Sequence, residues 1–80
     1  MEYKFNTKFK VGEIVYTLIN KKITEVEINK IEALINITYS DSFVINIKYY
    51  LVLNDYTHKY LGFADEEDLY RTKEELINNL

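Results

Sequence analysis

The fold is decided by residues 23–37, which read ITEVEINKIEALINI. As a helix, this segment has a capping box, because Glu27 follows Thr24 at the required spacing, and its apolar residues also fit a helical stripe. As a strand, its apolar residues alternate with polar ones up to Ile28 and resume with the opposite parity at Ile31, as a β-bulge between the two would produce. The residues alone leave both structures open, and the strand is the favoured interpretation.

Strand patterns lie on both sides of this segment. Residues 14–19 are rich in β-branched and aromatic side chains, and residues 43–53 alternate apolar and other side chains more clearly than any other stretch. Asn20 tolerates a left-handed backbone, which predicts a turn before the decisive segment, and residues 59–64 can form a short return strand. The sequence therefore predicts a mainly β chain of four or five strands.

A short helix is predicted at the C-terminal end. Thr72 and Glu75 form a second capping box, and three apolar residues follow at helical spacing. In residues 43–53, Tyr50 must point away from the face that Tyr49 shares, because neighbouring strand residues face opposite sides. The favoured cover for this outer face is the predicted helix, and a partner protein is the alternative. The apolar stripe of the helix would consist of Leu76, Ile77 and Leu80.

Length and composition indicate one domain over residues 1–80. Apolar residues make up 48% of the chain and charged residues 29%, which is typical of a globular protein and not of a disordered one. The chain has no cysteine, which excludes a disulfide framework, and its longest uncharged stretch, residues 33–40, is too short to cross a bilayer. No membrane association is expected.

The choice of residue types indicates the kind of genome that encodes the chain. Asn, Ile, Lys and Tyr fill 35 of the 80 positions, and AT-rich codons encode all four. This bias indicates an AT-rich bacterial genome, or a phage or mobile element that lives in one. The expected location is therefore the cytoplasm of a bacterial host cell.

Two short stretches resemble known proteins. Residues 9–16, FKVGEIVY, resemble the opening of Src-homology-3-like small barrels, including Tudor and KOW modules. Residues 65–77, DEEDLYRTKEELI, are similar to the ending of small uncharacterised proteins of low-GC bacteria and their phages. The resemblance implies a Src-homology-3-like barrel of four or five strands, with the C-terminal helix across one opening. The alternative fold is α+β, with a helix near residues 24–36.

Catalytic chemistry finds little support in the sequence. His58 is the one histidine, it falls in a predicted turn, and there is no cysteine and no glycine-rich phosphate loop. The pair Asp65 and Asp68 could offer oxygens to a cation, but acidic residues before a helix are also favoured by its dipole. We expect no enzyme activity, no bound metal and no cofactor.

Nucleic-acid binding is the alternative function. Lysines alternate with aromatic residues near the N-terminus, as they do in barrels that bind single strands. However, the chain has a single arginine, Arg71, and a formal net charge of −3, and both features disfavour nucleic acid. An edge strand with outward lysines is the favoured interpretation of the same residues. The candidate nucleic-acid contacts are Lys4, Lys8 and Lys10.

Recognition of another protein fits the residues better. Eight tyrosines are many for so small a core, because each buried hydroxyl needs a hydrogen-bond partner. The chain is therefore predicted to be a non-enzymatic interaction module. By analogy with small phage proteins, it would be a phage or mobile-element accessory protein that binds and modulates or inhibits a host protein, for example in a defence system. A phage protein as partner and a homodimer are further options. The predicted contact residues are Tyr39, Tyr50, Tyr56, Tyr60, Asp65, Glu66, Glu67 and Asp68.

Overall fold

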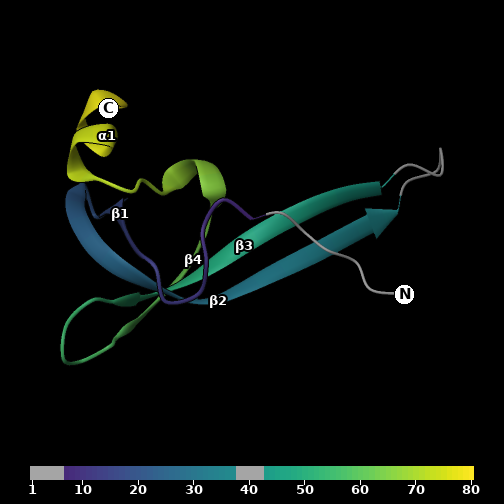
Figure 1. Cartoon of the computed structure of the whole chain (residues 1–80), viewed down its shortest axis with the longest axis horizontal. Helices are drawn as coiled ribbons and strands as arrows, with labels where there is room; N and C mark the ends of the chain where they lie inside the picture. The colour runs from purple at the N-terminus through teal and green to yellow at the C-terminus, as the bar shows by residue number, and fades with distance from the viewer. Residues whose placement is uncertain (1–6, 38–42) are drawn as a thin grey trace.

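The computed structural model describes residues 7–37 and 43–80, which form one antiparallel sheet followed by two short helices (Figure 1). The strand order is β1-β2-β3-β4, so each strand pairs with its neighbour in the sequence. The predicted mainly β class is confirmed. The elements are β1 (Ile14–Ile19), β2 (Lys22–Ile37), β3 (Phe43–Leu53), β4 (Tyr60–Asp65), the 3₁₀ helix η1 (Glu66–Asp68) and α1 (Lys73–Asn78).

The decisive segment is a strand, so the alternative helix near residues 24–36 is wrong. Its pairing with β3 runs from Val26 to Ile37, with a register shift between Ile28 and Lys30. The shift leaves Asn29 without a partner in the ladder, which is the predicted bulge. Because one residue is added, Ile28 and Ile31 both face the core side although their positions have opposite parity.

The hairpin from β1 to β2 turns on two residues in the left-handed region. Asn20 has a φ of 51° and Lys21 a φ of 66°, and Ile19 pairs directly with Lys22 across them. Two central residues with positive φ are typical of a type I′ turn, whose twist matches that of the strands it joins. The turn predicted from Asn20 is confirmed.

The sheet is bent but is not closed into a barrel, which corrects the expectation of a closed barrel. In the described part of the chain, β1 and β4 lie at opposite ends of the strand order. A single residue pair occupies the free edge of β1: the Tyr16 N–H donates to the Tyr70 carbonyl at 2.7 Å, and the Tyr70 N–H donates back at 2.9 Å. The chain after η1 therefore lies where β4 would have to pair to close a barrel.

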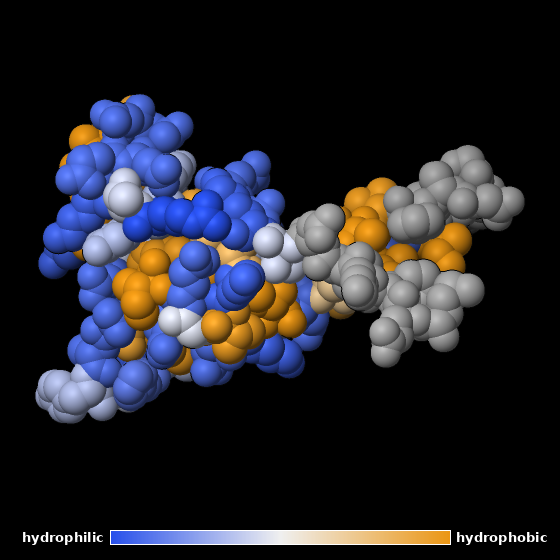
Figure 2. Space-filling view, viewed as in Figure 1, coloured by the Kyte–Doolittle hydropathy of each residue, from blue (hydrophilic) through white to orange (hydrophobic). Residues whose placement is uncertain are grey.

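One end of the sheet projects as a two-stranded ribbon. Pairing of β1 with β2 ends at Glu27, and pairing of β4 with β3 extends only to Lys48, whereas β2 and β3 remain paired as far as Ile37 and Phe43. We call the projecting part, residues 33–37 with 43–47, the arm. It lengthens the molecule to extents of 42 × 27 × 19 Å. Apolar residues, orange in Figure 2, are visible on it.

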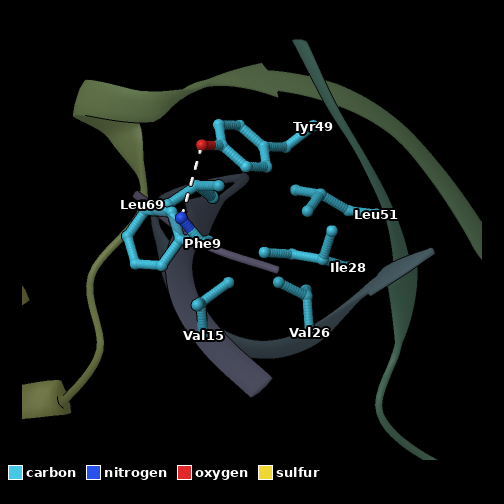
Figure 3. Close-up of a cluster of buried hydrophobic side chains, with 7 residues drawn as sticks. All are labelled: Phe9, Val15, Val26, Ile28, Tyr49, Leu51 and Leu69. Carbon is cyan, nitrogen blue, oxygen red and sulfur yellow. Dashed lines mark hydrogen bonds between the residues drawn. The ribbon is translucent and has the colours of Figure 1, made fainter. Parts of the chain in front are cut away.

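The core is assembled on the concave side of the sheet from distant parts of the chain (Figure 3). Phe9, before β1, is fully buried, and its ring meets the Tyr49 ring edge-on with 5.6 Å between centroids. The Phe9 N–H donates a hydrogen bond of 3.4 Å to the Tyr49 hydroxyl. Tyr49 therefore points inward, as the alternation in residues 43–53 predicted. The core cluster consists of Phe9, Val15, Val26, Ile28, Tyr49, Leu51 and Leu69.

The C-terminal helix contributes only part of its predicted stripe. Thr72 caps α1 as expected, because its hydroxyl accepts a hydrogen bond from the Glu75 N–H at 3.1 Å. Leu76 is buried, but Ile77 is 53% exposed and Leu80 is 75% exposed. The rings that contact Tyr50 belong to β4. The expectation that three residues of this helix cover the outer face of β3 is therefore wrong.

The Tyr49 hydroxyl makes alkaline stability a test of the core. It donates to Glu66 at 2.8 Å, and its pKa is raised above 10.0, first by burial and then by this hydrogen bond. A raised pKa contributes stability that is complete below the unfolded value of about 10 and is lost as pH rises through the folded value. We expect the free energy of unfolding to fall above about pH 10.

A phenylalanine variant isolates this contribution. Tyr49→Phe should cost about 1–2 kcal/mol at neutral pH, because Glu66 loses one of its two hydrogen-bond donors. It should also weaken the alkaline loss, which urea titrations between about pH 8 and 11 would measure. Equal alkaline slopes in the two proteins would contradict this role of Tyr49.

Candidate functional site

An irregularity in β4 builds a group of aromatic side chains on the outer, convex face of the sheet. Tyr50 pairs with Phe63, Leu51 pairs with Gly62, and then Val52 pairs with Tyr60, so Leu61 is an added residue. Gly62 has a φ of 98°, a conformation that glycine adopts without the steric cost of a Cβ. The added residue allows Tyr60 and Phe63 to share a face, although they are three positions apart.

The Tyr50 ring contacts the rings of both Tyr60 and Phe63. The Tyr50 and Tyr60 rings are stacked, with centroids 6.4 Å apart and planes at 19°, and the Phe63 ring lies 5.9 Å from Tyr50. Tyr60 is 56% exposed and Phe63 is 55% exposed, whereas Tyr50 is half-buried between them. We call Tyr50, Tyr60 and Phe63 the aromatic patch. It presents open ring surface on a rigid strand pair.

Charged side chains surround the patch. The ammonium groups of Lys30 and Lys48 lie over the rings of Tyr50 and Phe63, at 5.3 and 4.3 Å from their centroids. The Tyr50 hydroxyl donates to Glu32 at 3.2 Å, and Glu32 also lies 3.7 Å from the Lys30 ammonium. Desolvation first, and then Glu32, raises the pKa of Tyr50, which keeps the phenol protonated as a donor.

The predicted tyrosines have different positions. The structure brings Tyr50 and Tyr60 together, and it adds Phe63, which the sequence analysis did not select. Tyr56 is 95% exposed in the loop between β3 and β4, and Tyr39 lies outside the described residues. The missed signal was Gly62, because a glycine inside a strand pattern often marks a bulge.

The four consecutive acidic residues 65–68, which we call the acidic run, have two different roles. The Glu66 carboxylate accepts hydrogen bonds from the Tyr49 hydroxyl and from the Lys8 N–H, both at 2.8 Å. This side chain therefore joins η1 to the core and to the segment before β1. Asp65, Glu67 and Asp68 are exposed and remain candidates for contact with a partner.

The candidate lysines Lys8 and Lys10 lie in a segment without strand structure. Residues 7–13 form bends and a turn, so the predicted edge strand is wrong for the part of it that the structure describes. The Lys8 ammonium and the Arg71 guanidinium lie 5.2 and 4.9 Å from the centroid of the Phe9 ring. Lys10 is exposed, and Lys4 lies outside the described residues.

A hollow of about 380 Å³ lies beside the patch, in the gap that the unclosed sheet leaves between β1 and β4. Phe63 borders both the patch and the hollow, so an aromatic or aliphatic group of a partner could contact both. Leu76 of α1 and the two C-terminal residues also line it. The lining includes Leu18, Phe63, Asp68, Tyr70, Leu76 and Leu80.

His58 lies on the surface and belongs to no group of three metal-ligating side chains among the described residues. The His58 side chain is 63% exposed in the loop after β3, with its Nδ1 atom 3.8 Å from Glu27. Across residues 7–37 and 43–80, no three His, Asp or Glu side chains are grouped so as to hold a metal ion. In the same ranges, no helix has the length and apolar character needed to cross a bilayer.

Comparison with protein-family models, with curated proteins and with solved structures found no match to this chain.

Proposed function

We propose that this chain is a non-enzymatic module that binds another protein through the aromatic patch. The observation that carries the proposal is the contact of three aromatic rings, two of them more than half exposed, inside a rim of lysines and a glutamate. Tyrosine-rich clusters with a polar rim are where protein interfaces concentrate their binding energy. A patch on paired strands also loses little conformational entropy on binding.

Charge near the patch favours a partner with a basic surface. Residues 61–80 contain six acidic and two basic side chains, a net charge of −4. Asp65, Glu67 and Asp68 are exposed, and Asp65 pairs in the sheet with Lys48 of the rim. Opposite charge across an interface steers the encounter and selects the partner. A basic, nucleic-acid-binding surface on a host protein has the required character.

The abundance of residue types that AT-rich codons encode supports a bacterial or phage origin for this module. We therefore extend the proposal to an accessory protein of a phage or mobile element, working in the bacterial cytoplasm, that modulates or inhibits a host protein. A defence protein that grips nucleic acid with a basic surface is one such target. The acidic side chains and the patch would compete there with the phosphate backbone.

Truncation of the patch tests the proposal. With wild-type protein as bait in host extract, we expect a captured host protein whose affinity falls about 30-fold for Tyr60→Ala, the factor equivalent to a hot-spot loss of about 2 kcal/mol. The control is Ile77→Ala on α1, where the side chain is 53% exposed, close to the 56% of Tyr60. A partner that binds wild type and Tyr60→Ala equally would contradict the role of the patch.

Binding of single-stranded nucleic acid is the second candidate. The specific observation in its favour is that Lys30 and Lys48 flank open aromatic rings, an arrangement on which bases can stack. Carboxylates of Glu32 and Asp65 on the same face oppose it. A true complex would lose affinity steeply with added salt, so the absence of a mobility shift at low salt would remove this candidate.

A further inference from the structure

Among the described strands, none pairs with the two outer edges of the arm. In the described part of the chain, residues 30–37 of β2 pair only with β3, and residues 43–47 of β3 pair only with β2. Each outer edge therefore presents backbone N–H and C=O groups that no described strand satisfies (Figure 1). A two-stranded ribbon is also marginally stable by itself in water. The arm thus has both a hydrogen-bonding capacity and a need for further packing.

The arm also lacks the features that keep open edges apart. Its ten residues include no charged residue, no proline and no glycine. Natural edges are usually protected by lysines, prolines or bulges. Instead, apolar side chains are exposed here (Figure 2). The exposed fractions are 39% for Leu34, 47% for Ile35, 81% for Ile37, 51% for Val44 and 39% for Ile45.

The surface area of the chain is large enough to accommodate an interface. The accessible surface is 6313 Å², whereas scaling for a monomer of 9.6 kDa gives about 5,100 Å². The radius of gyration of 14.4 Å likewise exceeds the roughly 12 Å typical of 80 residues. The chain therefore exposes more surface than a compact monomer of its mass.

We infer that this arm pairs with the arm of a second copy of the chain, with the β2 edges antiparallel about a two-fold axis. The β2 edge is chosen because its open part, residues 30–37, is longer than that of β3. An antiparallel edge is complementary to itself, since the axis sets each donor against an acceptor of the identical strand.

The absence of charge on the arm favours a copy of the chain over an unrelated protein. Identical chains bring identical charges together at a two-fold axis, and like charges opposite each other across strands are destabilising. Residues 33–37 avoid that cost completely. A different partner is normally selected by complementary charge, which this arm does not offer. The inference of a dimer does not depend on the proposed function of the aromatic patch.

Light scattering on the purified protein tests the dimer. We expect a mass of about 19 kDa for wild type, twice the 9.6 kDa of the chain. Leu34→Lys and Ile37→Lys should each raise the dissociation constant at least about 100-fold, because each puts a charge from both copies into an edge that is otherwise apolar there. Ile77→Lys on α1 is the matched control, since its side chain is also exposed, and it should remain dimeric.

Cross-linking tests the geometry separately. Because the chain contains no cysteine, a single introduced cysteine reports only on its own surroundings. Under mild oxidation, at least one cysteine introduced singly at positions 33–37 should form a disulfide-linked dimer several-fold faster than Ile77→Cys, because strand pairs on an axis approach within disulfide distance. A monomeric wild type, a dimer that persists in both lysine variants, or cross-linking no faster in the arm than at Ile77 would each overturn the inference.

Discussion

Replacing Phe9 by alanine is expected to lower the free energy of unfolding by about 3–5 kcal/mol. The Phe9 ring is fully buried, meets Tyr49 edge-on and is the side chain that residues 7–13 contribute to the core cluster. Its removal leaves a cavity between the sheet and Leu69. A chain of this length has a total stability of only about 4–12 kcal/mol, so the variant should be near its unfolding threshold.

Urea unfolding followed by circular dichroism, at matched protein concentration, measures this loss. Phe63→Ala is the control, because it removes the same side chain where 55% of it is exposed, and should cost about 1 kcal/mol or less. If Phe9→Ala destabilises the chain no more than Phe63→Ala, the segment before β1 does not belong to the core.

Charge reversal at Glu66 and at Glu67 is expected to have very different effects on stability. Glu66→Lys should cost about 2–4 kcal/mol, since it removes the acceptor of two hydrogen bonds and leaves the Tyr49 hydroxyl unsatisfied. Glu67 is exposed at the next position of η1, and Glu67→Lys should change stability by about 0.5 kcal/mol or less.

Thermal and urea unfolding of the two variants would check the difference, with Glu66→Gln as an intermediate that keeps one acceptor oxygen. Similar stabilities for Glu66→Lys and Glu67→Lys would refute the scaffold role of Glu66. The expected contrast also decides how the acidic run must be tested for partner binding. Substitutions at Glu67 and Asp68 can report on a contact, whereas one at Glu66 would also damage the fold.

The local features of the fold were predictable because each depends on neighbouring residues. The parity change between Ile28 and Ile31 marked the bulge in β2, and Asn20 marked the hairpin turn. Closure of a barrel was not predictable in the same way, because it depends on which segment reaches the edge of β1. The structure places Tyr70 there, 54 positions from its partner Tyr16, and no local pattern records that choice.

The candidate site, too, was predictable only where it depends on neighbouring residues. Tyr50 and Tyr60 were selected for separate reasons, and the structure places their rings in contact. Phe63 was missed, because its parity relative to Tyr60 implied the opposite face until the residue added at Leu61 was known. Glu66 was predicted to contact a partner protein. The sequence shows its carboxylate, but it does not show that the Tyr49 hydroxyl donates a hydrogen bond to this carboxylate.

The way the core is assembled has a consequence for synthesis on the ribosome. Phe9 bonds to Tyr49 across 40 positions, and Lys8 bonds to Glu66 across 58. Contacts so distant in the chain slow folding, because a long loop must close before either partner is stabilised. The β1–β2 hairpin can form early, but its apolar side stays open until residue 69 has left the exit tunnel. Before that moment, the exposed apolar side makes the nascent chain a substrate for chaperones and proteases.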